Sequence, residues 1–157
     1  MSQRLSIWKK VSRSCGMKRN EFSRAGRQIR IASDVDIVEA RMAARALATE
    51  LGFEGADLVM IATAVSEVAR NIVEYAKLGE LWIAPTANGH LRGMQVVAKD
   101  RGPGIADIDR AMEDGYTTGR GLGIGLPGSR RLMDHFEIDS KVGKGTTVTM
   151  KKWLPRK

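Results

Sequence analysis

Apolar residues recur every three or four positions in two stretches of the first half of the chain, which is the spacing of amphipathic helices. The first stretch has its apolar positions at Ile37, Ala40, Ala44, Leu47 and Leu51. Ser33 or Asp34 is a suitable N-cap, because its side-chain oxygen can accept hydrogen bonds from the free N–H groups of the first turn. Gly52 is the expected end of this helix, since glycine is common just beyond a helix C-terminus.

The second stretch has the cleanest helical period in the chain and is expected to begin at about Gly55 or Ala56. Its apolar stripe consists of Leu58, Ile61, Val65, Val68, Ile72 and Tyr75. The polar residues that fall off this stripe are Thr63, Ser66, Glu67, Arg70, Asn71 and Glu74. Gly79 follows the last apolar position and is the expected end of the helix.

Five other segments have the short or alternating apolar runs that are typical of strands. These segments are 28–32, 81–84, 91–99, 136–140 and 146–153. The second and third are expected to be joined by a turn through Pro85, Asn88 and Gly89. The last two are expected to form a hairpin with its turn at 142–145.

Two short helices are expected at 105–112 and 122–133, the latter entered directly from a glycine-rich loop. The order of elements predicts an α/β fold: a two-layer sandwich in which helices cover one face of a mostly antiparallel mixed sheet. A chain of 157 residues has the length of one domain. No apolar run approaches the ~20 residues of a membrane-spanning helix, and Cys15 is the only cysteine, which excludes an intramolecular disulfide.

The net charge of +8 is concentrated at the N-terminus. Residues 1–27 contain eight basic residues and one acidic residue, whereas the rest of the chain contains eighteen and seventeen. Residues 28–157 are therefore nearly neutral, which argues against nucleic-acid binding by the folded domain. The basic segment has few apolar residues and several serines, which favours a disordered extension. A later start at Met17, or binding of a partner or nucleic acid by this segment, are the alternatives.

Glu67 and Asn71 are the first candidates for chemistry. Residues four apart on a helix lie on the same face, so this carboxylate and this amide are expected to be neighbours. An amide oxygen can bind Mg²⁺, and a carboxylate can accept a proton from a nucleophile. The alternative is an ordinary solvated helix face.

Three glycine-rich segments follow, at 100–104, 121–125 and 143–146. Asp100 ends a predicted strand and can accept a hydrogen bond from the amine of adenine, while Gly102 and Gly104 allow the backbone to approach the base closely. The segment 121–125 lacks the Lys-Ser/Thr ending of a P-loop and leads into a helix N-terminus, which favours an anion. Thr146 can add a hydroxyl near the base. Each segment taken alone is equally compatible with a plain turn.

The order of these motifs resembles the GHKL superfamily of ATPases and kinases, also called the Bergerat fold. The segment 66–72 resembles the N box of this superfamily, 100–104 its G1 box, 112–118 its ATP lid and 121–128 its G2 box. The Glu-Asp-Gly sequence in the lid and the closing Lys-Trp-Leu at 152–154 resemble the RsbT-type serine/threonine switch kinases of the bacterial stressosome. Residues 28–157 would then be a GHKL kinase domain.

The resemblance implies a Mg-ATP-dependent kinase that phosphorylates STAS-domain scaffold proteins of the RsbS and RsbR types. It also implies that the released kinase activates a phosphatase of the RsbU type in the cytoplasm. By the resemblance, Glu67 is the base, Asn71 the Mg²⁺ ligand and Asp100 the residue that recognises adenine. The remaining expected nucleotide-binding residues are Gly102, Gly104, Ile105, Gly121, Leu122, Gly123, Ile124, Gly125, Leu126 and Thr146. We further expect Arg120, in the lid, to approach the transferred phosphoryl group.

Two other functions are compatible with the same motifs. An anti-sigma factor kinase of the SpoIIAB or RsbW type would have the same fold and chemistry, and would also bind a sigma factor. A nucleotide-gated binding module with negligible catalysis belongs to another class. The presence of both Glu67 and Asn71 argues against that module, because binding alone does not need a base.

Overall fold

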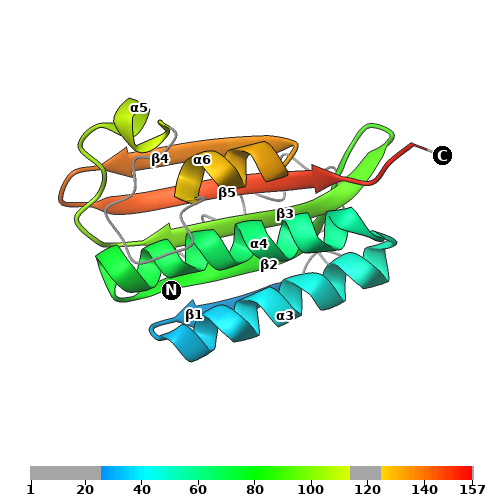
Figure 1. Cartoon of the computed structure of the whole chain (residues 1–157), viewed down its shortest axis with the longest axis horizontal. Helices are drawn as coiled ribbons and strands as arrows, with labels where there is room; N and C mark the ends of the chain where they lie inside the picture. The colour runs from blue at the N-terminus through cyan, green and yellow to red at the C-terminus, as the bar shows by residue number, and fades with distance from the viewer. Residues whose placement is uncertain (1–25, 114–124, 157) are drawn as a thin grey trace.

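The structure is a computed structural model that describes residues 26–113 and 125–156 of the chain (Figure 1). In chain order its elements are β1 (Arg27–Ile31), α3 (Asp34–Leu51), α4 (Ala56–Asn71), η1 (Ile72–Ala76), β2 (Gly79–Asn88), β3 (Leu91–Asp100), α5 (Ile108–Ala111), α6 (Gly125–Leu132), β4 (His135–Lys141) and β5 (Gly145–Trp153). The five predicted strands are all present, and the two long helices begin where the sequence indicated.

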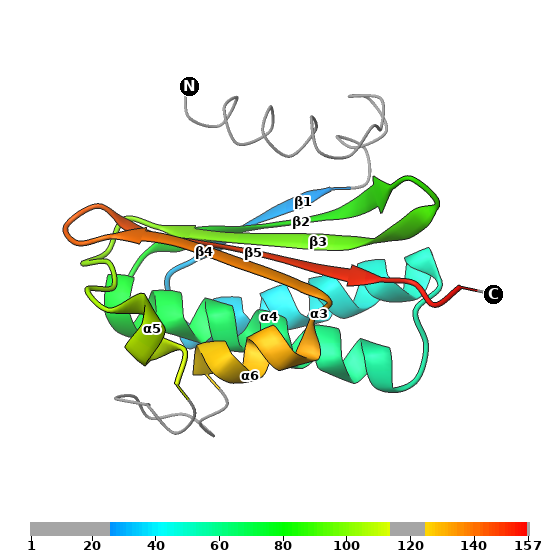
Figure 2. The same cartoon turned by 90° about the horizontal axis from the view of Figure 1, so that it is seen from above.

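The strands form one sheet in the order β1-β2-β3-β5-β4. The helices α3, α4 and α6 all lie on the same side of this sheet, as Figure 2 shows. The predicted two-layer α/β sandwich with helices on one face is therefore confirmed. The sheet was expected to be mixed, but every pairing among the described strands is antiparallel.

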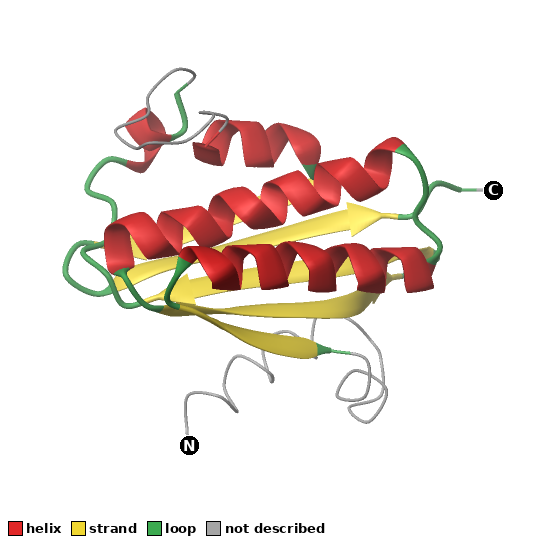
Figure 3. Cartoon of the chain, turned by 60° about the horizontal axis from the view of Figure 1, so that its bottom comes forward, coloured by secondary structure: helices red, strands yellow, loops and turns green. Residues whose placement is uncertain are grey.

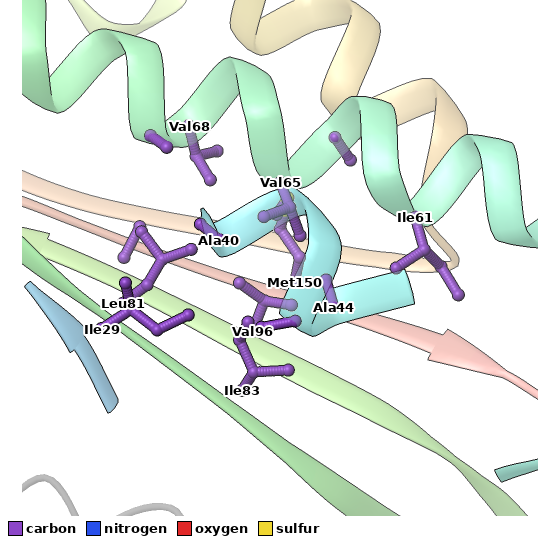
Figure 4. Close-up of a cluster of buried hydrophobic side chains, with 14 of the residues drawn as sticks. Ile29, Ala40, Ala44, Ile61, Val65, Val68, Leu81, Ile83, Val96 and Met150 are labelled. Atoms are coloured by element: carbon purple, nitrogen blue, oxygen red, sulfur yellow. The ribbon is translucent and has the colours of Figure 1, made fainter. Parts of the chain in front are cut away.

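The hydrophobic core fills the space between the helices and the sheet (Figure 4). Its central side chains come from both layers and include Ile29, Leu81, Ile83, Val96 and Met150 from the strands and Ala40, Ala44, Ile61, Val65 and Val68 from the helices. Full burial of one valine, leucine or isoleucine side chain contributes about 1.5–3 kcal/mol relative to exposure. The predicted apolar stripe of α4 thus fixes which face of this helix meets the sheet.

Both ends of α3 agree with the sequence. Ser33 is the N-cap, and the Asp36 carboxylate accepts hydrogen bonds from the backbone N–H groups of Ala32 at 2.8 Å and Ser33 at 3.0 Å. These bonds hold the pKa of Asp36 below its usual value, and the bond from Ala32 has the largest effect. At the other end, Gly52 has a φ of 102°, a left-handed conformation that glycine adopts without a Cβ clash.

The end of α4 was predicted incorrectly. After Asn71 the backbone widens into the π-helical turn η1, so the helix does not continue to Gly79. Gly79 instead begins β2, where an added Cβ would lie 2.7 Å from Ile72 Cγ2 and 2.7 Å from the carbonyl oxygen of Lys99. Glycine is needed here because the backbone passes close to its neighbours, which a sequence pattern does not reveal.

Two other local predictions were wrong. The side chain of Tyr75 is 47% exposed, because the wider π turn rotates the residues after α4 out of the α-helical phase. Pro85 was expected in a turn but lies inside β2, opposite Met94 of β3. β1 begins at Arg27, which pairs with Ile83, so Pro85 lies beyond the part of β2 that pairs with β1. A residue without an N–H donor is tolerated at such an unpaired strand edge.

Of the two predicted short helices, α5 is shorter than predicted, and α6 can be compared with its prediction only from Gly125 onward. α5 begins after Asp107, whose Oδ1 accepts a hydrogen bond from the backbone N–H of Arg110 at 3.0 Å, instead of beginning at Ile105. The helix predicted over 122–133 is described from Gly125 to Leu132, and its first three residues lie outside the described ranges. Within those ranges, no helix is long and apolar enough to cross a membrane.

Candidate active site

Glu67 is buried in the second half of α4. The residue is only 8% exposed, and its Oε1 accepts a hydrogen bond from Nη1 of Arg70 at 2.8 Å. The Arg70 side chain is 34% exposed and the Glu67 side chain 10%, so the arginine is the more solvent-accessible member of the pair. Buried carboxylates require a partner of this kind. The ordinary solvated helix face, which was the alternative interpretation of this segment, is contradicted at Glu67.

Asn71 is the last residue of α4, and its side chain is half-buried. It lies one helical turn after Glu67, so the carboxylate and the amide share one face of α4 as predicted. The π-helical turn η1 begins directly after Asn71. Isolated π turns at the end of or within α-helices are frequent at functional sites, so this turn favours a functional site at this end of the sandwich.

Asp100 is the last residue of β3, and its carboxylate joins two of the predicted glycine segments. Its Oδ1 accepts a hydrogen bond from the backbone N–H of Gly102 at 2.9 Å. The same oxygen accepts from the backbone N–H of Thr146 at 3.3 Å. Both bonds use Oδ1, so Oδ2 is the oxygen left to accept a hydrogen bond from a ligand.

The loop that follows Asp100 packs tightly against two other segments. An added Cβ at Gly102 would lie 2.6 Å from the Cβ of Ala76, which places this loop against the end of η1. Gly104 has a φ of 75°, and an added Cβ there would collide with the carbonyl oxygen of Lys141. Pro103 also accepts a hydrogen bond through its carbonyl from the N–H of Gly143 at 2.8 Å. The predicted loop, the end of the α4–η1 unit and the β4–β5 turn therefore meet at one end of the sandwich, on the left in Figure 1.

Ser140 connects the predicted site residues Ile105 and Thr146, and sequence reasoning missed it. Its Oγ accepts a hydrogen bond from the backbone N–H of Ile105 at 2.8 Å and lies 3.1 Å from the carbonyl oxygen of Gly145, to which it donates. Its contact of 2.8 Å with Thr146 Oγ1 then has Thr146 as the donor, because a hydroxyl carries one proton. This arrangement leaves the lone pairs of Thr146 Oγ1 for a ligand.

The predicted phosphate loop is described only at its end. Gly125 begins α6 with a φ of 51°, and its carbonyl accepts a hydrogen bond from the fully buried Ser129 hydroxyl at 3.1 Å. Leu126 is partly buried against the hydrophobic core. The other predicted members of this loop and of the lid, which are Arg120, Gly121, Leu122, Gly123 and Ile124, lie outside the described residues.

The donor set near Asn71 fits a Mg²⁺ ion that is shared with a phosphate. Mg²⁺ in such sites keeps several waters and takes one or two protein oxygens together with substrate phosphates. Asn71 offers a half-buried amide oxygen, a hard neutral ligand of this type. Among the described residues there is no group of three or more His, Cys, Asp or Glu side chains that could hold a metal ion without such help.

The fold and this cluster of segments define the class of protein, which is an ATP-binding α/β sandwich of the GHKL type. Comparison with known proteins agrees with this assignment. Residues 31–152 match the family described as the histidine kinase-like ATPase domain. The chain belongs to the histidine kinase-like ATPase family.

Two named relatives define its position in the family. The chain is 48% identical over 126 residues to the serine/threonine-protein kinase RsbT of Bacillus subtilis strain 168, which covers 80% of this chain and 95% of RsbT. It is 33% identical over 121 residues to an anti-sigma F factor of Thermoanaerobacter sp. strain X514, covering 73% of this chain and 83% of that protein. The identification of the chain as an RsbT-type serine/threonine kinase is confirmed.

A solved structure shows the same fold at lower identity. The crystal structure of the RsbU and RsbW domains of a Mycobacterium tuberculosis protein aligns with a TM-score of 0.55 and 22% identity. The alignment covers 82% of this chain and 33% of that one. At this identity the likeness supports the fold and not a particular activity.

Proposed function

We propose that this protein uses Mg-ATP to phosphorylate serine or threonine residues of STAS-domain scaffold proteins of the RsbS and RsbR types. The observation that carries the proposal is the buried Glu67 one turn before Asn71, at the end of the sandwich where the Asp100 loop packs. The identity of 48% to RsbT supports the substrate class. After phosphorylation the kinase is released, and it then binds and activates a phosphatase of the RsbU type.

Glu67 acts as the general base toward the acceptor hydroxyl. Its Oε1 is held by Arg70 at 2.8 Å, so Oε2 is the oxygen that accepts the proton. A base of this kind must lie within hydrogen-bond reach of the proton it removes. Arg70 serves as a positioning residue, because it restricts the rotation of the carboxylate without touching the reacting atoms.

Asn71 would hold the Mg²⁺ ion through its amide oxygen. When bound, the ion would supply positive charge that offsets the negative charge of the ATP phosphates. The protein contributes mainly positioning, because phosphoryl transfer through a loose transition state requires little covalent chemistry from side chains. The end of α4, where Glu67 is buried and bonded to Arg70, supplies that positioning.

Asp100 recognises adenine through Oδ2, which accepts from the exocyclic amine. The half-buried Ile105 and Leu126 provide apolar contacts to the base, and the Thr146 hydroxyl provides a second polar contact. Gly102 and Gly104 keep the backbone close enough to form the wall of this site. On the phosphate side, the glycine loop that includes Gly121, Leu122, Gly123, Ile124 and Gly125 surrounds the triphosphate, and Arg120 approaches the γ-phosphate.

The protein acts in the cytoplasm, where ATP is available and where a reducing environment suits its single cysteine. Residues 28–157, together with Arg27 at the start of β1, form the kinase domain, and the residues before them are an extension of it. Phosphorylation of the scaffold and release of the kinase constitute a partner switch, since the kinase binds the scaffold before transfer and the phosphatase after it.

The decisive experiment is transfer of labelled γ-phosphate from Mg-ATP to a purified STAS-domain protein, with ATP affinity measured separately by a fluorescent nucleotide. We expect transfer by the unmodified chain and loss of transfer in Glu67→Gln with ATP affinity retained. Asn71→Ala should lose both transfer and the Mg²⁺ dependence of ATP binding. Glu50→Gln, a matched change on the exposed face of α3, should behave like the unmodified chain. Full transfer by Glu67→Gln would contradict the assigned base.

The anti-sigma kinase is the second candidate, and the 33% identity to an anti-sigma F factor is the observation that favours it. Pull-down of purified sigma factor with and without Mg-ATP distinguishes the two. Nucleotide-dependent binding of a sigma factor would support the second candidate. Binding of the STAS protein and the phosphatase alone would support the first. ATP binding without transfer to any STAS protein would instead support a nucleotide-gated binding module.

A further inference from the structure

Four exposed basic residues lie together at the end of the sheet that carries the proposed nucleotide site, and we call them the basic surface. Each lies at or next to the end of a different strand. They are Lys77 shortly before β2, Arg101 directly after β3, Lys141 at the end of β4 and Lys144 directly before β5. The sheet order places these strand ends side by side, on the left in Figures 1 and 3.

Contacts between the loops at these strand ends hold the basic surface together. An added Cβ at Gly145 would lie 2.8 Å from the Cα of Arg101. The backbone N–H of Gly143 donates a hydrogen bond to the carbonyl oxygen of Pro103 at 2.8 Å. Neighbouring strands lie about 4.8 Å apart, so the three steps from β2 to β4 span about 14 Å. The four basic side chains therefore belong to one continuous surface.

The positive charge of this surface is not balanced within its own loops. The segments 77–79, 101–104 and 141–145 contain the four basic residues and no acidic residue. The rest of the domain from residue 28 onward contains fourteen basic and seventeen acidic residues. The predicted basic extension is a separate source of charge, and residues 1–25 lie outside the described ranges. A local excess of one sign attracts a partner of the opposite sign.

Exposed apolar side chains lie between the basic ones. Leu78, which follows Lys77, is 50% exposed, and Val142, between Lys141 and Lys144, is 69% exposed. Protein interfaces combine apolar side chains with charged residues around them. Nucleic-acid phosphates are bound by basic and polar groups and gain nothing from a leucine or a valine. The favoured occupant is therefore a protein with acidic residues around an apolar centre.

The basic surface also lies within reach of the proposed base. Lys77 follows Glu67 by ten residues along α4 and η1, which is about 15 Å at about 1.5 Å per residue. Arg101 directly follows Asp100, the residue proposed to recognise adenine. A folded domain of about 100 residues has a radius of gyration of about 13 Å. A protein docked on the basic surface is thus large enough to place a hydroxyl at Glu67 as well.

We propose that the basic surface, together with Leu78 and Val142, is the docking site for an acidic surface of the STAS-domain protein that is phosphorylated. This inference rests on the proposed function, because it names the place where that substrate binds. The basic residues accelerate association with an acidic partner, and the apolar residues become buried on docking. The surface therefore determines which protein is phosphorylated, and it does not take part in the transfer step.

The test is phosphoryl transfer from Mg-ATP at varied concentrations of the STAS-domain protein. We expect Lys141→Glu with Lys144→Glu to raise the KM for this protein about tenfold or more, with kcat and ATP affinity unchanged. The difference should shrink at high ionic strength, because salt screens exposed charges. Leu78→Ser should raise the KM at both ionic strengths. The matched control is Arg92→Glu with Arg156→Glu, which makes the same change in net charge at exposed positions near the opposite end of the sheet and should leave the KM unchanged.

Direct binding of the STAS-domain protein, measured by calorimetry with a non-hydrolysable ATP analogue, separates this inference from the proposed function. Binding that the Lys141→Glu, Lys144→Glu variant loses, without phosphoryl transfer by the unmodified chain, would support the docking site and contradict the kinase function. Transfer with the same KM in this variant and in the control would overturn the docking site alone. A STAS-domain protein that is neither bound nor phosphorylated would overturn both. Loss of binding to the phosphatase or to duplex DNA, with an unchanged KM for the STAS-domain protein, would also overturn the proposal.

Discussion

At the residue scale, the pair formed by Arg70 and Glu67 determines how the proposed base is oriented. A hydrogen bond to a charged group contributes about 1.5–3 kcal/mol. We expect Arg70→Ala to lower the rate of phosphoryl transfer by about ten- to a hundredfold and to leave ATP affinity nearly unchanged. Single-turnover transfer from labelled ATP and a separate nucleotide-binding titration measure the two effects.

The controls for this prediction separate positioning from charge. Arg70→Lys keeps a cation but not the planar geometry of the guanidinium, so it should restore only part of the rate. Arg45→Ala removes an exposed arginine from α3 and should have no effect. If Arg70→Ala weakened ATP binding as much as it slowed transfer, Arg70 would be a nucleotide-binding residue instead.

Ser140 is the second residue with a testable role, because one hydroxyl joins three backbone or side-chain groups near the proposed adenine site. We expect Ser140→Ala to lower the free energy of unfolding by about 1–3 kcal/mol, since it leaves the N–H of Ile105 without its partner. ATP affinity should fall as well. Chemical unfolding and a nucleotide titration measure both quantities.

The matched control is Thr49→Ala, because the Thr49 hydroxyl donates to a carbonyl within its own exposed helix turn at 2.9 Å. Its loss should change stability much less, since water can replace the bond. A Ser140→Ala protein with unchanged stability and ATP affinity would show that the contact has no energetic importance.

The residues of the candidate site were predictable from sequence to different degrees. Glu67 and Asn71 are recognisable because both lie in one helix, where spacing alone determines that they share a face. Ser140 is not recognisable, because its partner Ile105 is 35 residues away in the chain and only the folded sheet brings them together. The ion pair of Glu67 with Arg70 lies between these cases, since the spacing permits it but burial makes it necessary.

At the scale of the elements, the start of α3 should respond to pH. The hydrogen bonds from Ala32 and Ser33 keep the pKa of Asp36 below its usual value of 3.8. A carboxyl with a lowered pKa in the folded state contributes stability above the unfolded value, and the contribution is lost as pH falls through the folded value. Well above pH 3.8, the free energy of unfolding of the unmodified chain should therefore exceed that of Asp36→Asn by a constant amount. Below that pH the difference between the two proteins should become smaller.

Urea unfolding over a series of pH values measures this difference. Asp34→Asn is the control, because it changes a neighbouring carboxylate that makes neither of these two bonds. Its difference from the unmodified chain should show a weaker dependence on pH. A gap between Asp36→Asn and the unmodified chain that widened on acidification would contradict the assigned bonds.

Lys152 joins three elements, and this gives the lysine of the Lys-Trp-Leu ending a structural role. Its Nζ donates to the carbonyl oxygen of Leu132 at 3.0 Å and lies 3.5 Å from Asp134 Oδ1 and 3.8 Å from Asp57 Oδ1. We expect Lys152→Met to lower the free energy of unfolding by about 1–3 kcal/mol, since both carboxylates keep partial contact with water. Lys151→Met, one residue earlier on the other sheet face, should cost less. Equal losses in the two variants, measured by chemical unfolding, would contradict this role.

The starts of the two long helices, the positions of the strands and the two strand pairs joined by turns followed from local patterns. The end of α4 and the position of Pro85 did not. Ser33 and Gly52 could be identified because capping depends on neighbouring residues. The π-helical turn and the strand position of Pro85 depend on contacts with β3 and on where β1 begins, which no local pattern contains. Gly79 was misassigned for the same reason, because its absence of a side chain serves packing against Ile72 and Lys99.

At the scale of the whole molecule, the sheet order brings the site together. β3 and β5 are neighbours, so the loop after Asp100 and the start of β5 at Gly145 meet although they are distant in the chain. The π-helical turn after α4 packs on the same loop. A nucleotide bound there would contact all three segments at once, and its binding free energy would therefore stabilise the entire sandwich.

Thermal unfolding with different nucleotides tests this coupling and the proposed adenine recognition together. At about one hundred times its dissociation constant, Mg-ATP should add about 2.7 kcal/mol of stability and raise the melting temperature by about 5–10 °C. Mg-GTP at the same concentration should have little effect, because guanine presents a carbonyl oxygen where adenine presents an amine, and the Asp100 carboxylate cannot donate to it.

Asp100→Asn is a conservative test, since its Oδ1 can still accept from Gly102 and Thr146 while an NH₂ group replaces Oδ2. In Asp100→Asn we expect ATP to stabilise the protein less than it stabilises the unmodified chain. GTP should stabilise this variant more, relative to ATP, than it does the unmodified chain. The stability of the protein without nucleotide should change little. Asp109→Asn, an exposed change in α5, should keep the preference for ATP. If Asp100→Asn lost stability without ligand and kept its preference for ATP, Asp100 would be a residue that holds the loop and does not recognise the base.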